Sequence, residues 1–228
     1  MISENVAAIQ EKIAISARKS GREPKDIKLI GVTKTIDLPR IKELLAAGVE
    51  DIGENRVQEF LPKYEALNAE NVNWHFIGHL QRNKVKFIAD KVDLIHSVDS
   101  LPLAEEVNRC AEKAGRVIKI LIEVNIAEES SKFGILKCGI FEFVENLVKL
   151  PHVSLCGLMC VPPFVENAEE NRRFFENMRN LKLDIQRNWL YHTIPLELSM
   201  GMTGDYSVAI EEGATMVRIG TALFGERI

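Results

Sequence analysis

Eight short apolar runs, separated by longer segments, follow one another along this 228-residue chain, and their alternation constrains the fold more than any other feature. The runs are continuous and rich in β-branched residues, which is typical of strands that are buried on both faces. When such strands alternate with helices they form a parallel sheet, because each connection has to cross over before the next strand begins. The predicted strands cover residues 27–33, 49–53, 74–78, 94–98, 117–126, 153–159, 197–200 and 216–219.

The segments between these runs have apolar residues at helical spacing, and a further amphipathic helix precedes the first strand. In this opening helix Ile2, Val6 and Ile9 recur at spacings of four and three, and Ser3 is its candidate cap. The other predicted helices cover residues 38–47, 56–67, 101–114, 139–150, 168–185 and 206–212.

Eight strand–helix units favour an α/β fold that closes into a (β/α)8 barrel of the TIM-barrel type. We expect a single domain over residues 1–228, because no stretch rich in Pro, Gly or Ser marks a linker. A barrel of this type takes about 250 residues, so the connections in this shorter chain must be short. We expect the extra N-terminal helix to cover the bottom of the barrel. An open, doubly wound sheet is the alternative arrangement of the same elements.

The distribution of charge argues against nucleic acid and membranes as partners. The 29 basic and 33 acidic residues give a net charge of −4 and are scattered, so no basic block could neutralise phosphates or an anionic surface. No apolar run is long enough to span a membrane, and the N-terminus carries charges where a signal peptide needs an apolar core. We therefore expect a cytoplasmic protein, and the cysteines interpreted as its reduced core residues are Cys110, Cys138, Cys156 and Cys160.

Polar residues follow the predicted strands at the end where barrel enzymes carry their reactive groups. They are Lys34, Glu54, Asn55, His79, Ser97, Asn125, Ser199, Arg218 and Thr221. Lys34 is the most informative of them, because partial burial at the end of an apolar strand disfavours the charged form of an amine. The neutral amine is a nucleophile that could form a Schiff base with an aldehyde.

Two segments rich in small residues stand after the seventh and eighth predicted strands, where barrels often bind phosphate. The first, SMGMTGDYS, offers hydroxyl groups at Ser199 and Thr203, and the second, RIGTALFG, offers Gly220 and Thr221. Backbone N–H groups, hydroxyl groups and helix dipoles could converge there on an anion. The same residues are equally typical of a tight turn and helix cap.

Arg218 lies beside the second of these segments as a cation that can donate hydrogen bonds but does not give up its proton. Asn55 could donate to a ligand oxygen, although it is equally suited to cap the helix that follows. An aldehyde-bearing phosphate ester that reacts with Lys34 and offers a ring nitrogen to Arg218 fits pyridoxal 5′-phosphate. An ordinary ion pair is the alternative interpretation of Arg218.

Other ligand classes lack their usual motifs. The chain has no Gly-x-Gly-x-x-Gly, no Walker loop and no Gly-x-Ser-x-Gly elbow. His75 and His79 have the spacing of a helical metal pair, but in an extended strand they would lie about 13 Å apart. We therefore expect no metal site.

Five motifs, in the same order, resemble those of the pyridoxal-phosphate homeostasis proteins: IGVTK, DIGENRVQE, WHFIGHLQRNK, LSMGMTGDYSVAI and VRIGTALFG. The resemblance spans nearly the whole chain. It implies a barrel similar to that of alanine racemase, with pyridoxal phosphate as a Schiff base on Lys34 and Arg218 facing the pyridine nitrogen. The phosphate contacts that it implies are Ser199, Thr203, Gly220 and Thr221.

The resemblance implies a binding and carrier protein that buffers pyridoxal phosphate and supplies it to apo-enzymes, without established enzymatic turnover. A cation against the ring nitrogen discourages its protonation, which weakens the electron sink that catalysis needs. The alternative is a pyridoxal-phosphate-dependent amino-acid racemase or lyase, with Tyr206 or His79 as a second acid or base. A third is a cofactor-free Schiff-base aldolase. By analogy with a racemase barrel that lacks its second domain, we expect a monomer.

Overall fold

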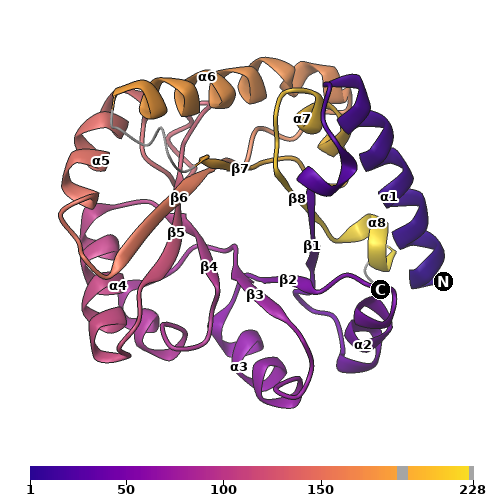
Figure 1. Cartoon of the computed structure of the whole chain (residues 1–228), viewed down its shortest axis with the longest axis horizontal. Helices are drawn as coiled ribbons and strands as arrows, with labels where there is room; N and C mark the ends of the chain where they lie inside the picture. The colour runs from indigo at the N-terminus through magenta and orange to yellow at the C-terminus, as the bar shows by residue number, and fades with distance from the viewer. Residues whose placement is uncertain (189–194, 226–228) are drawn as a thin grey trace.

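The strands close into a barrel in which each strand pairs in parallel with the next one along the chain (Figure 1). The computed structural model describes residues 1–188 and 195–225. The last strand pairs with the first, which confirms the predicted barrel and excludes the open sheet. The strands are β1 (Lys28–Val32), β2 (Asp51–Glu54), β3 (Asn73–Phe76), β4 (Leu94–Val98), β5 (Ile118–Glu123), β6 (Val153–Met159), β7 (Glu197–Ser199) and β8 (Met216–Ile219).

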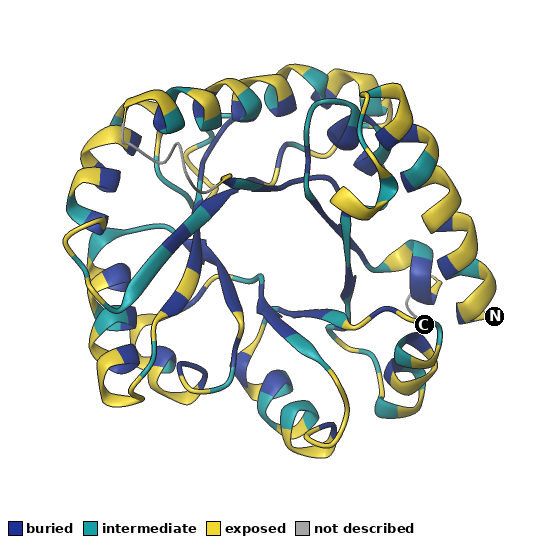
Figure 2. Cartoon of the chain, viewed as in Figure 1, coloured by how far each residue is buried: buried dark blue, intermediate teal, exposed yellow. Residues whose placement is uncertain are grey.

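Helices surround the barrel as an outer ring, and their buried faces turn towards the strands (Figure 2). Among the described residues, no helix is both long and apolar enough to cross a membrane. The helices are α1 (Ile2–Lys19), α2 (Leu38–Ala46), α3 (Val57–Ala66), α4 (Leu101–Lys113), α5 (Ile140–Leu147), α6 (Arg172–Asn188), α7 (Tyr206–Glu211) and α8 (Thr221–Phe224). The 3₁₀ helices are η1 (Pro24–Asp26), η2 (Arg82–Phe87), η3 (Lys137–Gly139) and η4 (Ala168–Asn171).

The N-terminal helix α1 lies in the outer ring against α7, α8 and α2, and not across the barrel bottom as predicted (Figure 1). The reason is that α8 has only four residues and is too short to cover the seam between β8 and β1 by itself. Helix α1 completes this cover with its predicted apolar stripe, of which the buried members are Ile2, Val6, Ile9, Ile13 and Ala17. The helix begins after Met1, so the predicted cap Ser3 lies inside its first turn.

The buried apolar side chains form two separate clusters, one between the strands and the helices and one inside the barrel. The outer cluster holds most of them, including Phe60, Phe76 and Phe175. The inner cluster is small and consists of Ile30, Leu94, Leu121, Met159 and Met216. Strand side chains alternate in direction, so each strand turns further side chains into the barrel besides those of the inner cluster. Several of these inward side chains are polar.

A bulge in β6 shapes the inner cluster. The partner of β5 changes from Leu155 opposite Ile120 to Gly157 opposite Leu121, which leaves Cys156 as an extra residue. Both Cys156 and Met159 pack in the inner cluster, although a spacing of three would turn them to opposite faces of a regular strand. The bulge therefore sets which side chains of β6 enter the barrel.

The four cysteines are free, but they are not all core residues. Cys110 and Cys160 are buried as predicted, and Cys156 is partly buried. Cys138 is exposed, so its assignment to the core was wrong. It lies in η3, a surface turn in which no residue is buried.

Replacing Ile9 by Ala tests whether α1 belongs to the core of the fold. Ile9 is 4% exposed, so its truncation should lower the free energy of unfolding by about 2–5 kcal/mol through lost burial and a cavity. The control is Ile15→Ala on the same helix, where the side chain is 47% exposed and the change should stay below about 0.5 kcal/mol. Urea denaturation measures both, and equal losses would contradict this packing of α1.

Candidate functional site

Arg218 lies on β8, and Lys34 follows the neighbouring strand β1 at the carboxyl-terminal end of the barrel, here named the barrel mouth. Strand β1 pairs with β8 in a register that sets Ile30 opposite Arg218, and Lys34 follows shortly after the end of β1. Lys34 is partly buried. Closure of the barrel thus places the predicted amine and the predicted cation, from distant parts of the chain, on neighbouring elements of the barrel.

The backbone directly after Lys34 is strained. Thr35 has a φ of +64°, a left-handed conformation that β-branched residues rarely adopt. Its N–H group donates to Oε2 of Glu59 on α3 at 2.7 Å, which holds the turn in place. Such conformations cost on the order of 1–3 kcal/mol and cluster at functional sites. The strain therefore singles out the turn that carries Lys34.

Arg218 is fixed inside the barrel by three hydrogen bonds. Its Nη1 donates to the backbone oxygen and to Oγ of Ser199 at 2.7 and 2.6 Å, and Nη2 donates to the backbone oxygen of Cys160 at 2.8 Å. Burial lowers the pKa of the guanidinium, yet an arginine keeps its charge at neutral pH. These bonds use three of its five N–H donors, so up to two are left for a ligand. The described partners are uncharged oxygens, unlike the ion pair considered from the sequence.

Glu123, at the end of β5, is a titratable group of the mouth that the sequence did not single out. Burial raises the pKa of Glu123 to about 7, the charge of Asp99 adds to this, and Arg218 acts against it. Such a carboxyl group exchanges its proton near neutral pH. The alternation of side chains along a strand could have predicted this position of Glu123. Leu121 lies in the inner cluster, and Glu123, two residues later, faces the same side of the strand.

The two small-residue segments after β7 and β8 are joined to each other. The hydroxyl of Thr203 accepts a hydrogen bond from the N–H group of Ala222 at 3.4 Å. Gly201 has a φ of +91°, and a Cβ added there would lie 2.6 Å from a side-chain atom of α7, so glycine is required. Gly220 and Thr221 form the start of α8, where Gly220 is partly buried and Thr221 is exposed.

Ser199 differs from the other predicted phosphate contacts, because its side chain lies inside the barrel. It is fully buried, and its Oγ accepts the hydrogen bond from Arg218. The same atom lies 2.9 Å from Nδ1 of His96, a residue that the sequence did not single out. The hydroxyl of Ser199 is therefore engaged with the interior of the barrel.

Asn55 stands at the edge of the mouth, before the cap of the following helix. Helix α3 begins after Arg56, which takes the cap position, so the capping interpretation of Asn55 was wrong. The Oδ1 atom of Asn55 is buried without a hydrogen-bond partner among the described residues. Leaving such an atom unpaired costs about 1–3 kcal/mol. It marks a position where a donor from a ligand would be stabilising.

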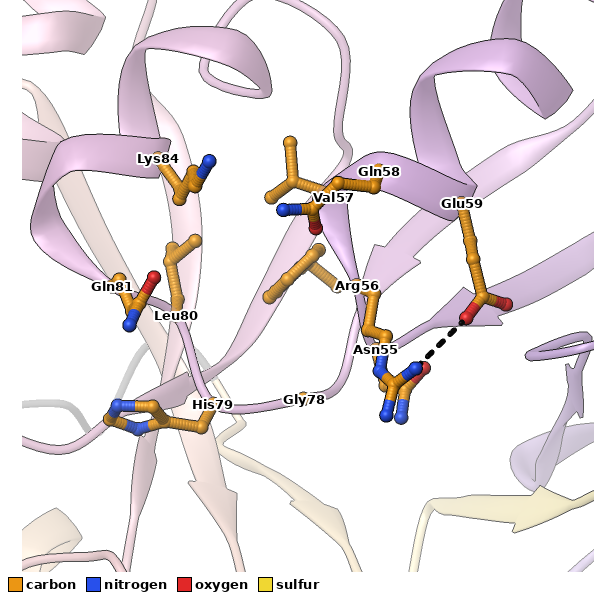
Figure 3. Close-up of a pocket in the computed structure, with 11 residues that line it drawn as sticks. Asn55, Arg56, Val57, Gln58, Glu59, Gly78, His79, Leu80, Gln81 and Lys84 are labelled. Atoms are coloured by element: carbon orange, nitrogen blue, oxygen red, sulfur yellow. Dashed lines mark ion pairs between the residues drawn. The ribbon is translucent and has the colours of Figure 1, made fainter.

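A cavity of 690 Å³ lies beside the mouth, between α3 and the loop that follows β3 (Figure 3). Figure 3 shows His79, Gln81 and Lys84 along one side and Arg56 with Asn55 on the other. Asn55 directly follows β2 at the mouth and also lines this cavity, and it carries the buried oxygen that has no partner among the described residues.

Two other residues of the predicted strand ends, Glu54 and Asn125, serve the fold instead. Glu54 is buried between β2 and α3, where it accepts from Oγ1 of Thr33 at 2.6 Å and from Nζ of Lys63 at 2.7 Å. Asn125 holds its own loop, because its Nδ2 donates to the backbone oxygen of Glu129 at 2.8 Å. The polar residues at the predicted strand ends therefore include some, such as Glu54 and Asn125, whose side chains hold the fold and do not face the mouth.

The two residues considered as a second acid or base are placed differently. Tyr206 is 6% exposed and packs in the outer cluster, and burial raises the pKa of its hydroxyl. His79 lies at the surface, with its ring stacked on Phe133 and its Nδ1 3.2 Å from Oδ2 of Asp99. Of the two, His79 is the accessible one.

No group of three or more His, Cys, Asp or Glu side chains is placed to hold a metal ion among residues 1–188 and 195–225. His75 and His79 take part in separate contacts. Nε2 of His75 lies 2.8 Å from Asp51, on the inner side of the barrel, whereas His79 pairs with Asp99.

Glu123→Gln tests the raised pKa through the pH dependence of stability. A carboxyl whose pKa is higher in the folded chain than its ordinary value of 4.5 binds more protons when folded, so its contribution to stability is lost as pH rises towards about 7. Between about pH 4.5 and pH 8 the unfolding free energy of the wild type should fall about 3 kcal/mol more than that of the variant. Glu145→Gln, an exposed change on α5, should follow the wild type. Identical profiles for Glu123→Gln and the wild type would contradict the assignment.

The chain is similar to known proteins along nearly its whole length. The family model described as "Alanine racemase, N-terminal domain" matches residues 5–228. The pyridoxal phosphate homeostasis protein of Aquifex aeolicus is 46% identical over 224 residues, which cover 98% of this chain and 97% of the relative. That of Escherichia coli is 36% identical over 229 residues, covering 99% and 97%. The solved structure of PipY from Synechococcus elongatus with pyridoxal phosphate bound has a TM-score of 0.85 and 34% identity, and covers 99% of this chain and 100% of that one.

Proposed function

Since this chain belongs to the pyridoxal phosphate homeostasis protein family, we propose that it holds pyridoxal 5′-phosphate covalently on Lys34 and buffers it or supplies it to apo-enzymes. The observation that carries the proposal is the pairing of β1, which Lys34 follows, with β8, which carries Arg218. The relatives are named for homeostasis of the cofactor and not for a reaction on amino acids. One barrel domain, over residues 1–228, would carry the whole function.

The residues of the mouth fit three parts of the cofactor, which are its aldehyde, its ring nitrogen and its phosphate group. The amine of Lys34 can condense with the aldehyde, with loss of one water molecule. Arg218 has up to two N–H donors left for the ring nitrogen. The joined segments at Thr203 and Thr221 would receive the phosphate group, and the unpaired oxygen of Asn55 would accept a hydrogen bond from the ligand.

Support for the four predicted phosphate contacts is not equal. Thr203, Gly220 and Thr221 lie on the two joined segments and have the stronger support. The hydroxyl of Ser199 is already engaged by Arg218 and His96. Its role in holding Arg218 is the better supported one.

Arg218 also accounts for binding without turnover. Bound pyridoxal phosphate supplies an electron sink whose strength depends on a proton at its ring nitrogen. An arginine holds such a nitrogen by donating a hydrogen bond and does not transfer its proton at neutral pH. Tyr206, buried in the outer cluster, offers no second base at the mouth. These properties favour storage and delivery of the cofactor over catalysis.

We further propose a cytoplasmic monomer that meets apo-enzymes transiently. The four free cysteines support a reducing compartment. Partners that receive the cofactor would meet it at the mouth, whereas the scattered charge gives no surface for nucleic acid.

Borohydride reduction followed by peptide mapping tests the covalent attachment. Protein loaded with pyridoxal phosphate should be yellow, and reduction should leave one stable adduct on the peptide that contains Lys34. Lys34→Ala should lose both, whereas the control Lys84→Ala, in the neighbouring cavity, should keep both. An adduct on a different lysine would overturn the proposal. Racemisation of an amino acid that depends on Lys34 would favour the enzyme alternative.

Asn55→Ala separates a ligand contact from a structural one. Because the variant removes a buried oxygen that has no partner, the ligand-free protein should lose little or no stability. Loss of one hydrogen bond to the ligand should weaken retention of pyridoxal phosphate about tenfold. Thermal unfolding without ligand and equilibrium dialysis with it measure the two effects. A large loss of stability with unchanged retention would assign Asn55 to the fold alone.

A further inference from the structure

A continuous series of side-chain contacts enters the barrel from its base, at the amino-terminal end of the strands. Nζ of Lys28 donates to Oδ1 of Asp51 at 2.9 Å, and Nε2 of His75 lies 2.8 Å from the same oxygen. Nδ1 of His75 then lies 2.9 Å from Nε2 of His96. A cavity of 530 Å³ borders Lys28 and Asp51 and lies at this base.

The series continues from His96 to the mouth. Nδ1 of His96 lies 2.9 Å from Oγ of Ser199, and Arg218 donates to that oxygen at 2.6 Å. The exposed fractions are 0% for His96 and Ser199 and 4% for Arg218, so water does not compete for these bonds. Six strands contribute to this interior chain, whose members are Lys28, Asp51, His75, His96, Ser199 and Arg218.

The two ends of the interior chain fix the direction of its bonds. Burial acts to raise the pKa of Asp51, but hydrogen bonds from His75 and Lys28 outweigh this and hold it below its ordinary value. An ionised carboxylate only accepts, so Nε2 of His75 must carry a hydrogen. At the other end Arg218 only donates, so the oxygen of Ser199 must accept from it.

Two arrangements satisfy both ends. With neutral His75, Ser199 donates to Nδ1 of His96, and Nε2–H of His96 donates to Nδ1 of His75. With charged His75, both bonds are reversed: His75 donates to Nε2 of His96, and Nδ1–H of His96 donates to Ser199. The arrangements differ by one proton, which water supplies and which remains on His75. His96 exchanges one tautomer for the other, and Ser199 keeps its single hydrogen.

His96 itself stays neutral in both arrangements. Full burial lowers its pKa well below the ordinary value, and the charges of His75, Arg218 and Lys28 act in the same direction. Other charges also act on the interior: Glu123 and Asp205 act on Arg218, and Lys119 and Glu197 act on Cys156. Asp51 is the anion in direct contact with His75, so it is the group that stabilises the charged arrangement.

We propose that the interior chain positions Arg218 and that the charge state of His75 fixes the direction of the hydrogen bonds between His75 and Ser199. The positioning residues are Asp51, His75 and His96, which act on Arg218 through Ser199. This inference rests on the proposed function, in which Arg218 faces the ring nitrogen of the cofactor. In the neutral arrangement Ser199 donates onward and is a stronger acceptor for Arg218. In the charged arrangement the hydroxyl of Ser199 no longer donates to His96. Ser199 is then a weaker acceptor, so its hydrogen bond from Arg218 weakens.

Histidine ¹⁵N NMR on the protein without cofactor tests the interior chain directly. Where the spectrum shows neutral His75, His96 should carry its hydrogen on Nε2, and where it shows charged His75, on Nδ1. A tautomer of His96 that does not match the charge of His75 would overturn the inference, and this measurement needs no variant.

Asp51→Asn removes the anion that stabilises charged His75, so at a given pH the variant should show more of the neutral arrangement, with the hydrogen of His96 on Nε2. The matched control is Glu54→Gln, which removes a second carboxylate of β2 that is bound by a lysine but faces α3. It should leave the tautomer of His96 unchanged. Equal changes in the two variants would show a general effect of lost charge and overturn the role of Asp51.

Absorbance of the protein loaded with pyridoxal phosphate tests the link to Arg218. Its absorption spectrum should change in Asp51→Asn together with the tautomer of His96 and should stay unchanged in Glu54→Gln, which a purely structural role would not produce. An unchanged spectrum in Asp51→Asn, despite a changed tautomer, would overturn the link while Lys34 still holds the cofactor. Failure to bind the cofactor would instead refute the proposed function and leave the histidine ¹⁵N spectra to decide the interior chain.

Discussion

The pairing of β1 with β8 is the interaction on which the other features of this molecule depend. Parallel strands need long connections, so a closed parallel barrel joins the first strand to the last only after all other strands are in place. That pairing makes β1, which leads into the turn of Lys34, the neighbour of β8, which carries Arg218. It also creates the seam that α1 covers, since α8 is too short to do so. The candidate site and the cover of the barrel are therefore two results of one closure.

The barrel interior contains both apolar and polar side chains, and the two kinds have different requirements for burial. The inner apolar cluster needs only shape and volume, whereas buried polar groups must each find a partner. The interior chain meets this need by contacts that run across strands, ending at Lys28 on one side and Arg218 on the other. The bulge at Cys156 adjusts the remaining space and places Cys160, whose backbone oxygen completes the hold on Arg218. The buried hydrogen bonds of the barrel interior thereby hold the cation Arg218 in a fixed position.

Much of the architecture could be predicted from periodicity alone, because strands buried on both faces and amphipathic helices leave clear patterns. The apolar stripe of α1 was predicted correctly, but its place was not, since the shortness of α8 is a tertiary fact. Lys34 and Arg218 were predicted as strand-end residues. The direction of Glu54 and the contacts of His96 were missed, because they depend on which face each side chain takes and on register between strands. The pKa of Glu123 arises from burial, which no local pattern contains.

Helix α1 packs on α8, and Nδ2 of Asn5 donates to the backbone oxygen of Leu223 at 2.9 Å. Because α1 precedes α8 in the chain, its apolar side lacks this cover until the later residues have been synthesised. Contacts between such distant parts of a chain form late, because a long loop must close before they can be made. Until then Val6 and Ile9 lack the cover of α8, and a chaperone that binds short apolar helices would find a target there.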